Sequence, residues 1–241
     1  MRIPRIRGNI ERRILANFAV DPEVMARQLP APFRPIVYRG KAVGGICLIR
    51  LAGVRPRFLP AFAGYSSENA AHRIAVEWTD AAGQRCEGVY IPRRDTSSLL
   101  NTWLGGRLFP GVHHHARFAV RETSDELSVD MQSDDGDARV AVHGRVAASL
   151  PAGSVFGSLA EASRFFERGS LGYSKTMRDG EYDGLELKTF GWRVEPLEVT
   201  EIASSYFDDG ARFPAGSVRF DCALVMRNVD HEWLGRASLV A

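Results

Sequence analysis

The chain has 241 residues, of which 45% are hydrophobic and 25% are charged. These values are ordinary for a globular protein, and they exclude a chain that is mainly disordered. The 31 basic and 29 acidic residues leave a net charge of +2, so the composition predicts neither a nucleic acid nor an acidic membrane surface as a partner.

The first half of the chain predicts mostly strands. Strands are expected over 10–20, 35–38 and 42–51, with a helix over 21–29 that begins at Asp21–Pro22 and ends before Pro30. In 72–78 the residues alternate, so His72, Ile74, Val76 and Trp78 share one face of a strand. A short strand over 88–92 then leads into a helix over 96–108.

The second half predicts a meander followed by a helical segment. Strands over 112–121, 126–132 and 138–148 are separated by turns at 124–125 and 134–137. Ser158 and Glu161 form a capping box that opens a helix, and a further helix is expected over 196–206. Late strands are expected over 185–194 and 218–227.

These elements indicate one domain over residues 1–241, since no repeat or flexible linker divides the chain. The expected fold class is α+β, built on a mostly antiparallel sheet that closes into a barrel or cone or is covered at its edges.

The sequence also suggests a location for the protein. Charged residues interrupt the N-terminal segment, and the most apolar stretch, 42–54, is broken by Arg50 and too short to span a bilayer. Three widely spaced cysteines, Cys47, Cys86 and Cys222, are typical of buried thiols in a reducing compartment. We therefore expect a cytoplasmic protein with no membrane partner, whose oligomeric state the sequence does not indicate.

Three consecutive histidines are the most unusual local feature. On a strand, His114 would share the apolar face with Ala116, whereas His113 and His115 would lie on the polar face. Two such imidazoles could ligate a metal together with a third group such as His143, or they could position a ligand. No metal-binding or cofactor motif accompanies them, and we expect no bound metal and no cofactor.

Two clusters of charged residues complete the set of candidates. Arg94 lies where a strand passes into a helix, a place that favours a carboxylate or phosphate. Glu68 and Arg73 form a second polar cluster beside a strand. The expected substrate-binding residues are Glu68, Arg73, Arg94, His113, His114 and His115, and the catalytic residues stay unassigned.

These candidates predict a protein that binds a small organic anion, and whether it is an enzyme stays open. One alternative is a metal-dependent lyase or hydrolase that uses His113 and His115. The other is a non-catalytic structural or interaction protein.

The stretch from Glu87 to Asn101, continuing through Gly105-Gly106-Arg107-Leu108-Phe109 to His113-His114-His115-Ala116, resembles the YqjF-like family of bacterial domains of unknown function. Glu68 with Arg73, the segment 166–168 and the pair 173–174 resemble further motifs of that family, in the same order along the chain.

The family is similar in turn to acetoacetate decarboxylase. This implies a mostly antiparallel β-cone or barrel that encloses a cavity, with a few helices outside it. The decarboxylase works through a lysine Schiff base, and its Pro-Lys-Lys segment falls, within one residue, on Val112-His113-His114. The lysines of this chain are Lys41, Lys175 and Lys188, so the resemblance implies the fold and the cavity without that activity.

Overall fold

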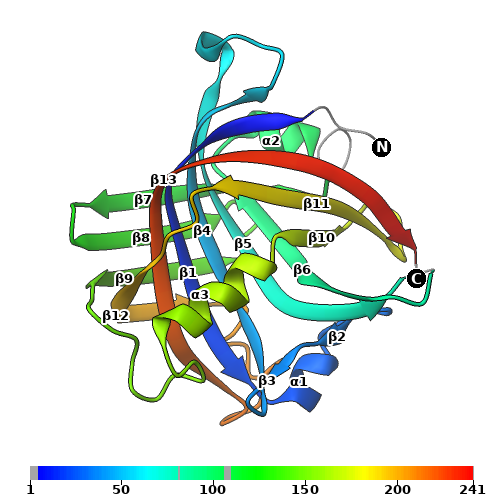
Figure 1. Ribbon diagram of the computed structural model, residues 1–241, viewed down its shortest axis with the longest axis vertical. Coiled ribbons are helices and arrows are strands. Elements are labelled where there is room, and N and C mark those ends of the chain that lie inside the picture. The colour runs from blue at the N-terminus through cyan, green and yellow to red at the C-terminus, as the bar shows by residue number, and fades with distance from the viewer. Residues whose placement is uncertain (1–4, 81, 106–109, 241) are drawn as a thin grey trace.

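The computed structural model describes residues 5–80, 82–105 and 110–240 (Figure 1). The first strands are β1 (Ile6–Val20), β2 (Arg34–Pro35), β3 (Val37–Tyr38), β4 (Lys41–Pro56), β5 (Tyr65–Thr79) and β6 (Arg85–Thr96). The later strands are β7 (His114–Glu122), β8 (Glu126–Ser133), β9 (Arg139–Val146), β10 (Leu171–Lys175), β11 (Glu181–Phe190), β12 (Glu195–Ser204) and β13 (Val218–Val240). The helices are α1 (Pro22–Ala26), α2 (Leu99–Leu104) and α3 (Leu159–Arg168), with a 3-10 turn at Ala61–Ala63.

A sheet of five long antiparallel strands, in the order β13-β1-β4-β5-β6, forms the centre of the molecule. Each outer strand of this sheet has two further partners. Strand β13 pairs with β12 at Ala223–Val225 and with β11 at 230–240. Strand β6 pairs with β10 at Val89–Ile91 and with β7 at Asp95–Thr96. The pairings therefore close two rings of strands, one through β10 and β11 and one through β7, β8, β9 and β12.

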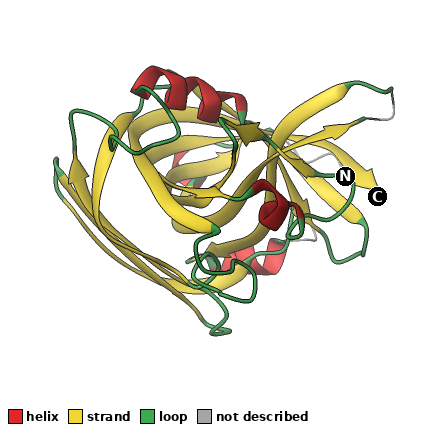
Figure 2. Cartoon of the chain, turned by 90° about the horizontal axis from the view of Figure 1, so that it is seen from below, coloured by secondary structure: helices red, strands yellow, loops and turns green. Residues whose placement is uncertain are grey.

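The two rings use opposite faces of the central sheet. On β1, Ile14 and Ala16 pack into one core, together with residues of β8 and β9. Leu15, on the opposite face, packs into a second core with Cys47 of β4 and Phe166 of α3. Figure 2 shows α3, the longest helix, lying on the outside of the curved strands. Because side chains alternate between the two faces of each long strand, the same strand contributes apolar residues to both cores.

The expected α+β class with a mostly antiparallel sheet is confirmed, with parallel pairing only between β6 and β7 and between β6 and β10 among the described strands. The helix at Ser158 is also confirmed, because the Ser158 side chain accepts a hydrogen bond from the Glu161 backbone N–H. In 72–78 the face that carries Arg73 is buried as well, since α3 covers it.

Three local expectations were wrong. The segment 196–206 is mostly strand β12, because pairing with β9 and β13 outweighs the helix start that Pro196 suggested. Strand β10 was not predicted from the sequence. Helix α2 spans only Leu99–Leu104, capped by Ser98, so it begins three residues later than the expected 96–108. Part of the expected helix, 106–109, lies outside the described residues.

Within the described residues, no helix is long and apolar enough to cross a membrane.

Candidate ligand cavity

A cavity of about 380 Å³ lies inside the ring that contains β10 and β11, beneath α3. Strand alternation brings Leu15, Cys47 and Ala71 to its floor, and these three residues are neighbours across β1, β4 and β5. Phe165 and Phe166 of α3 form part of its wall. The next residue across the sheet from Ala71 is Arg94, so the register of four strands places a guanidinium at the cavity.

Arg94 has a hydrogen bond to one neutral partner. Its Nε donates to the Ser174 hydroxyl at 2.8 Å, and among the described residues no carboxylate lies within 4.0 Å of its nitrogens. Burial lowers the pKa of Arg94 to about 10, so the guanidinium stays charged at neutral pH. Gly111 (φ +82°) lies against this pair, and a Cβ there would be 2.6 Å from the Cβ of Ser174. Among the described residues, the terminal nitrogens of Arg94 have no hydrogen-bond partner, so they can bind an anion.

His113 lines the cavity next to Arg94. Burial lowers the pKa of His113 to about 3, and the nearby Arg94 charge adds to this effect. Its Nδ1 lies 3.0 Å from the Gly111 carbonyl oxygen, which can only accept a hydrogen bond. The imidazole is therefore neutral with its proton on Nδ1, and Nε2 is left as a proton acceptor.

Two further arginines, Arg13 and Arg73, line the cavity. Arg73 is 5% exposed, and its guanidinium lies 4.9 Å from the centre of the Phe166 ring and donates to Asn17. Arg13 donates from Nε to the Cys47 sulfur at 3.2 Å. Among the described residues neither arginine has a carboxylate within 4.0 Å.

The acidic residues of the lining are already paired. Asp95 accepts from Arg93 at 2.8 Å, and Glu161 accepts from Arg39 at 3.1 Å and from the Tyr38 hydroxyl. Glu87 lies 3.9 Å from Arg85. Arg164 and Arg168, which also line the cavity, are exposed on α3. The cavity is therefore a cationic site with apolar walls.

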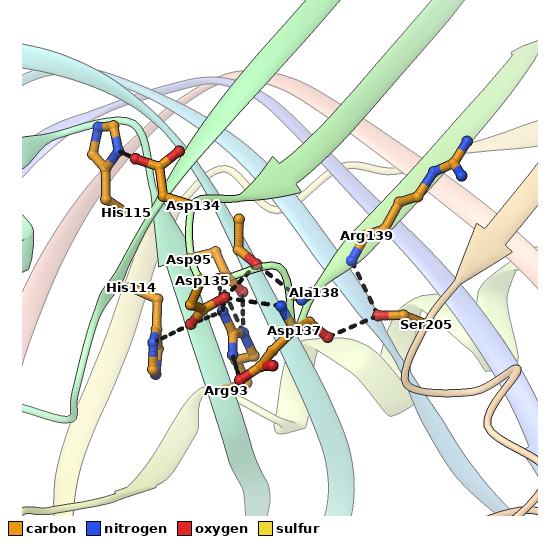
Figure 3. A network of polar contacts seen from close by, with 11 residues as sticks. Arg93, Asp95, His114, His115, Asp134, Asp135, Asp137, Ala138, Arg139 and Ser205 are labelled. Atoms are coloured by element: carbon orange, nitrogen blue, oxygen red, sulfur yellow. Dashed lines mark hydrogen bonds and ion pairs between the residues drawn. The ribbon is translucent and has the colours of Figure 1, made fainter.

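The structure brings together Arg73, Arg94 and His113 from the predicted set, but not Glu68, His114 or His115. Glu68 lies on the opposite face of β5, where its carboxylate binds Arg12 and Arg50 at 2.5 Å each. His114 and His115 do not line the cavity. Their side chains lie against the turn after β8 (Figure 3), with Nδ1 2.9 Å from Asp135 and 2.7 Å from Asp134, respectively.

The expectation that His113 and His115 share a strand face was wrong, because β7 begins only at His114. His113 belongs to the preceding loop, where strand alternation does not apply. His143, the suggested third metal ligand, contacts Asp130 and Glu201 instead. The part of the chain that the structure describes contains no group of three or more histidine, cysteine or acidic side chains arranged to hold a metal.

Sequence reasoning missed Arg13, Phe166 and the role of Cys47 as a lining residue. Alternation along the strands over 10–20 and 42–51 places Arg13 and Cys47 on the same face of the sheet. This pattern could have identified both residues as lining the cavity. None of the lysines lines the cavity. Lys41 pairs with Asp21, Lys175 lies 3.4 Å from Asp179, and Lys188 is exposed over the Phe190 ring.

Comparison with known structures places this arrangement in the acetoacetate decarboxylase-like fold. Acetoacetate decarboxylase from Legionella pneumophila subsp. pneumophila str. Philadelphia 1 superposes with a TM-score of 0.65 at 10% identity, covering 99% of this chain and 88% of that one. An acetoacetate decarboxylase-like enzyme from Sphingomonas wittichii RW1 gives 0.60 at 12% identity, covering 100% and 94%. The enduracididine biosynthesis enzyme MppR complexed with pyruvate gives 0.59 at 10% identity, covering 98% and 90%.

A family model matches residues 8–210, and the chain belongs to that family, DUF2071, described as an uncharacterized conserved protein (COG2071). The expected membership in an uncharacterised family is thereby confirmed, and the similar structures confirm the expected acetoacetate decarboxylase-like fold. No curated protein matches the chain in sequence.

Proposed function

We propose that this protein binds a small organic anion in the cavity, with a carboxylate of the ligand on Arg94 and His113 beside it. The observation that carries the proposal is a partly buried guanidinium at the cavity, whose terminal nitrogens have no hydrogen-bond partner and no carboxylate within 4.0 Å among the described residues. Burying an uncompensated charge is unfavourable, so a bound anion would stabilise this site.

The geometry favours a carboxylate as the anionic group. The terminal nitrogens of a guanidinium match the two oxygens of a carboxylate, and such paired hydrogen bonds are stronger than neutral ones. MppR, which shares the fold, has been solved in complex with pyruvate, a keto acid. The Nε2 of His113 adds a proton acceptor to the same site, which suits a ligand with a hydroxyl group near its carboxylate.

The test is calorimetric titration of the purified protein with pyruvate, acetoacetate and 3-hydroxybutanoate. The variant Arg94→Met should weaken binding by roughly 10- to 100-fold, since it removes charge-assisted hydrogen bonds. Arg94→Lys should retain part of the affinity, because an ammonium keeps the charge but not the paired geometry. Arg27→Met, at an exposed position outside the cavity, is the matched control and should bind as the wild type does.

The alternative of a structural or interaction protein without a ligand predicts no binding in any of these titrations. A cationic cavity with apolar walls next to the histidine run favours the ligand-binding proposal over it. The metal-dependent alternative gains no support from the geometry, since each of His113, His114 and His115 has a different neighbour.

A further inference from the structure

We infer that the natural ligand is an amphipathic monocarboxylate with an extended apolar body, rather than a short keto acid. This inference rests on the proposed function, because it assumes that Arg94 holds the carboxylate. It adds a second part to the site, an apolar wall formed by Ile6, Ile49, Leu51, Val54, Leu187 and Trp233.

The apolar wall begins beside Arg94 and continues along the strands away from it. On β4, Cys47 lies in the same row across the sheet as Arg94, and Ile49 and Leu51 follow on the same face. Four residues of strand correspond to about 13 Å, so Leu51 lies well beyond the reach of a short acid held at Arg94. Beyond Leu51, Ile6 is paired with Trp233, which is in turn paired with Leu187.

The cavity volume agrees with a ligand of this kind. At about 380 Å³ the cavity falls within the range of roughly 300–1,000 Å³ found for pockets that enclose drug-sized ligands. Apolar cavities bind water poorly and take up apolar molecules. A short acid on Arg94 would leave the space along Leu51, Leu187 and Trp233 empty, whereas an alkyl or aryl chain would fill it.

The cationic groups agree with one carboxylate rather than two. Arg73 already stacks on Phe166 and donates to Asn17. Arg13 donates from Nε to Cys47, and its guanidinium also lies 5.9 Å from the centre of the Trp192 ring. Arg164 and Arg168 are exposed on α3, where water solvates their charges, and neither is paired across the sheet with Ile6, Trp233 or Leu187. No arginine or histidine of the described lining lies in that row, so the far end of the ligand is uncharged.

The experiment is a titration with acetate, butanoate, hexanoate and octanoate under identical conditions. Burial of each methylene is worth about 0.8 kcal/mol, so the affinity should rise up to about fourfold per methylene along the series. Leu187→Trp should remove this gain while retaining the binding of acetate and butanoate. Lys188→Trp, on the same strand but exposed, is the matched control and should retain the full gain.

A second measurement does not depend on the folding of the Leu187 variant. The bromine of 8-bromooctanoate quenches tryptophan fluorescence on contact, and Trp233 lines the apolar wall. The quenching expected in the wild type should disappear in Trp233→Phe and persist in Trp103→Phe. Persistence in Trp233→Phe would overturn the inference.

Two outcomes separate the inference from the proposed function. If octanoate binds no better than acetate while Arg94→Met still abolishes binding, the amphipathic ligand is ruled out and anion binding stands. If octanol binds as tightly as octanoate, the carboxylate contributes nothing, and the proposed function fails together with the inference.

Discussion

Arg94 and Arg73 show two ways in which a fold accommodates a buried guanidinium. Burial lowers the pKa of both to about 10, so both are charged at neutral pH. Arg73 gains a cation–π contact with Phe166 and a hydrogen bond to Asn17. The hydrogen bond of Arg94 to Ser174 leaves its terminal nitrogens open to a ligand. A difference in neighbours, and not in residue type, therefore makes Arg94 the better binding residue.

The placement of the lysines predicts that no Schiff base forms with a keto acid. Trapping requires a neutral amine at the ligand carbonyl, and Lys41, Lys175 and Lys188 all lie outside the cavity. Borohydride added in the presence of acetoacetate should leave the mass of the intact protein unchanged, as measured by mass spectrometry. A reduced adduct mapped to one lysine would contradict this prediction and restore a decarboxylase-like mechanism.

Buried neutral histidines predict a loss of stability in acid. Burial lowers the pKa of His72 to about 3, with Arg93 and Arg212 adding to the effect. The unfolded chain binds this proton near pH 6.5 and the folded chain does not, so the free energy of unfolding falls as the pH drops from about 6.5 toward 3. His72 contributes up to about 1.4 kcal/mol per pH unit in that window.

His72→Phe tests this contribution, because phenylalanine can keep the contact with Tyr206 without binding a proton. Urea unfolding between pH 7 and pH 4 should show a smaller dependence on pH for the variant than for the wild type. If the free energy of unfolding depended equally on pH in the variant and the wild type, His72 would not cause the loss of stability in acid.

At the scale of single elements, β5 explains why only part of the predicted site assembles. Glu68 and Asn69 are adjacent in sequence, but their side chains point to opposite faces of the strand. Asn69 lines the cavity, whereas Glu68 joins a network with Arg12, Arg50 and Glu122 that links β1, β4, β5 and β7. Glu68 therefore links neighbouring strands and does not line the cavity.

Glu68→Gln should accordingly lower stability without changing ligand affinity. Arg12 is 1% exposed and keeps Glu122 as its second carboxylate, so weakening its bond to Glu68 should cost about 1.5–3 kcal/mol. Urea unfolding measures the loss, and titration with octanoate checks the affinity. Glu122→Gln, at the more exposed end of the network, should cost less than about 1 kcal/mol. Weaker binding by folded Glu68→Gln would return Glu68 to the site.

The start of β7 shows a limit of strand patterns. The residues 112–121 predict a strand, and the strand forms, but it begins two residues later. That small shift takes His113 out of the alternation and leaves it in a loop whose Gly111 lies against Arg94 and Ser174. Strand boundaries depend on pairing with β6 and β8, which the local sequence does not specify.

At the scale of the whole molecule, two arginines of α3, Arg164 and Arg168, lie at the border of the cavity. Arg164 and Arg168 are exposed on this helix, and among the described residues neither has a carboxylate within 4.0 Å. Exposed charges of this kind attract an oppositely charged ligand during diffusion, and added salt screens the effect.

Replacing both arginines by glutamine should lower the association rate constant for octanoate by about two- to tenfold at low salt and leave the dissociation rate unchanged. Stopped-flow fluorescence measures both rates. The difference from the wild type should shrink as salt is added, and Arg27→Gln serves as the exposed control. A change confined to the dissociation rate would mean that these arginines contact the bound ligand.

The sequence alone determined the fold class, most of the strands, the capped helix at Ser158 and a cationic, lysine-poor set of candidate residues. These features follow from local patterns, since alternation, capping and composition act over a few residues. The tertiary structure decided which faces of β5 and β6 enclose the cavity, and so selected Arg73, Arg94 and His113 over Glu68, His114 and His115. Two rings of strands bury both faces of one central sheet. Alternation separates the two faces but cannot tell which of them encloses the ligand, because that depends on pairings between strands far apart in the chain.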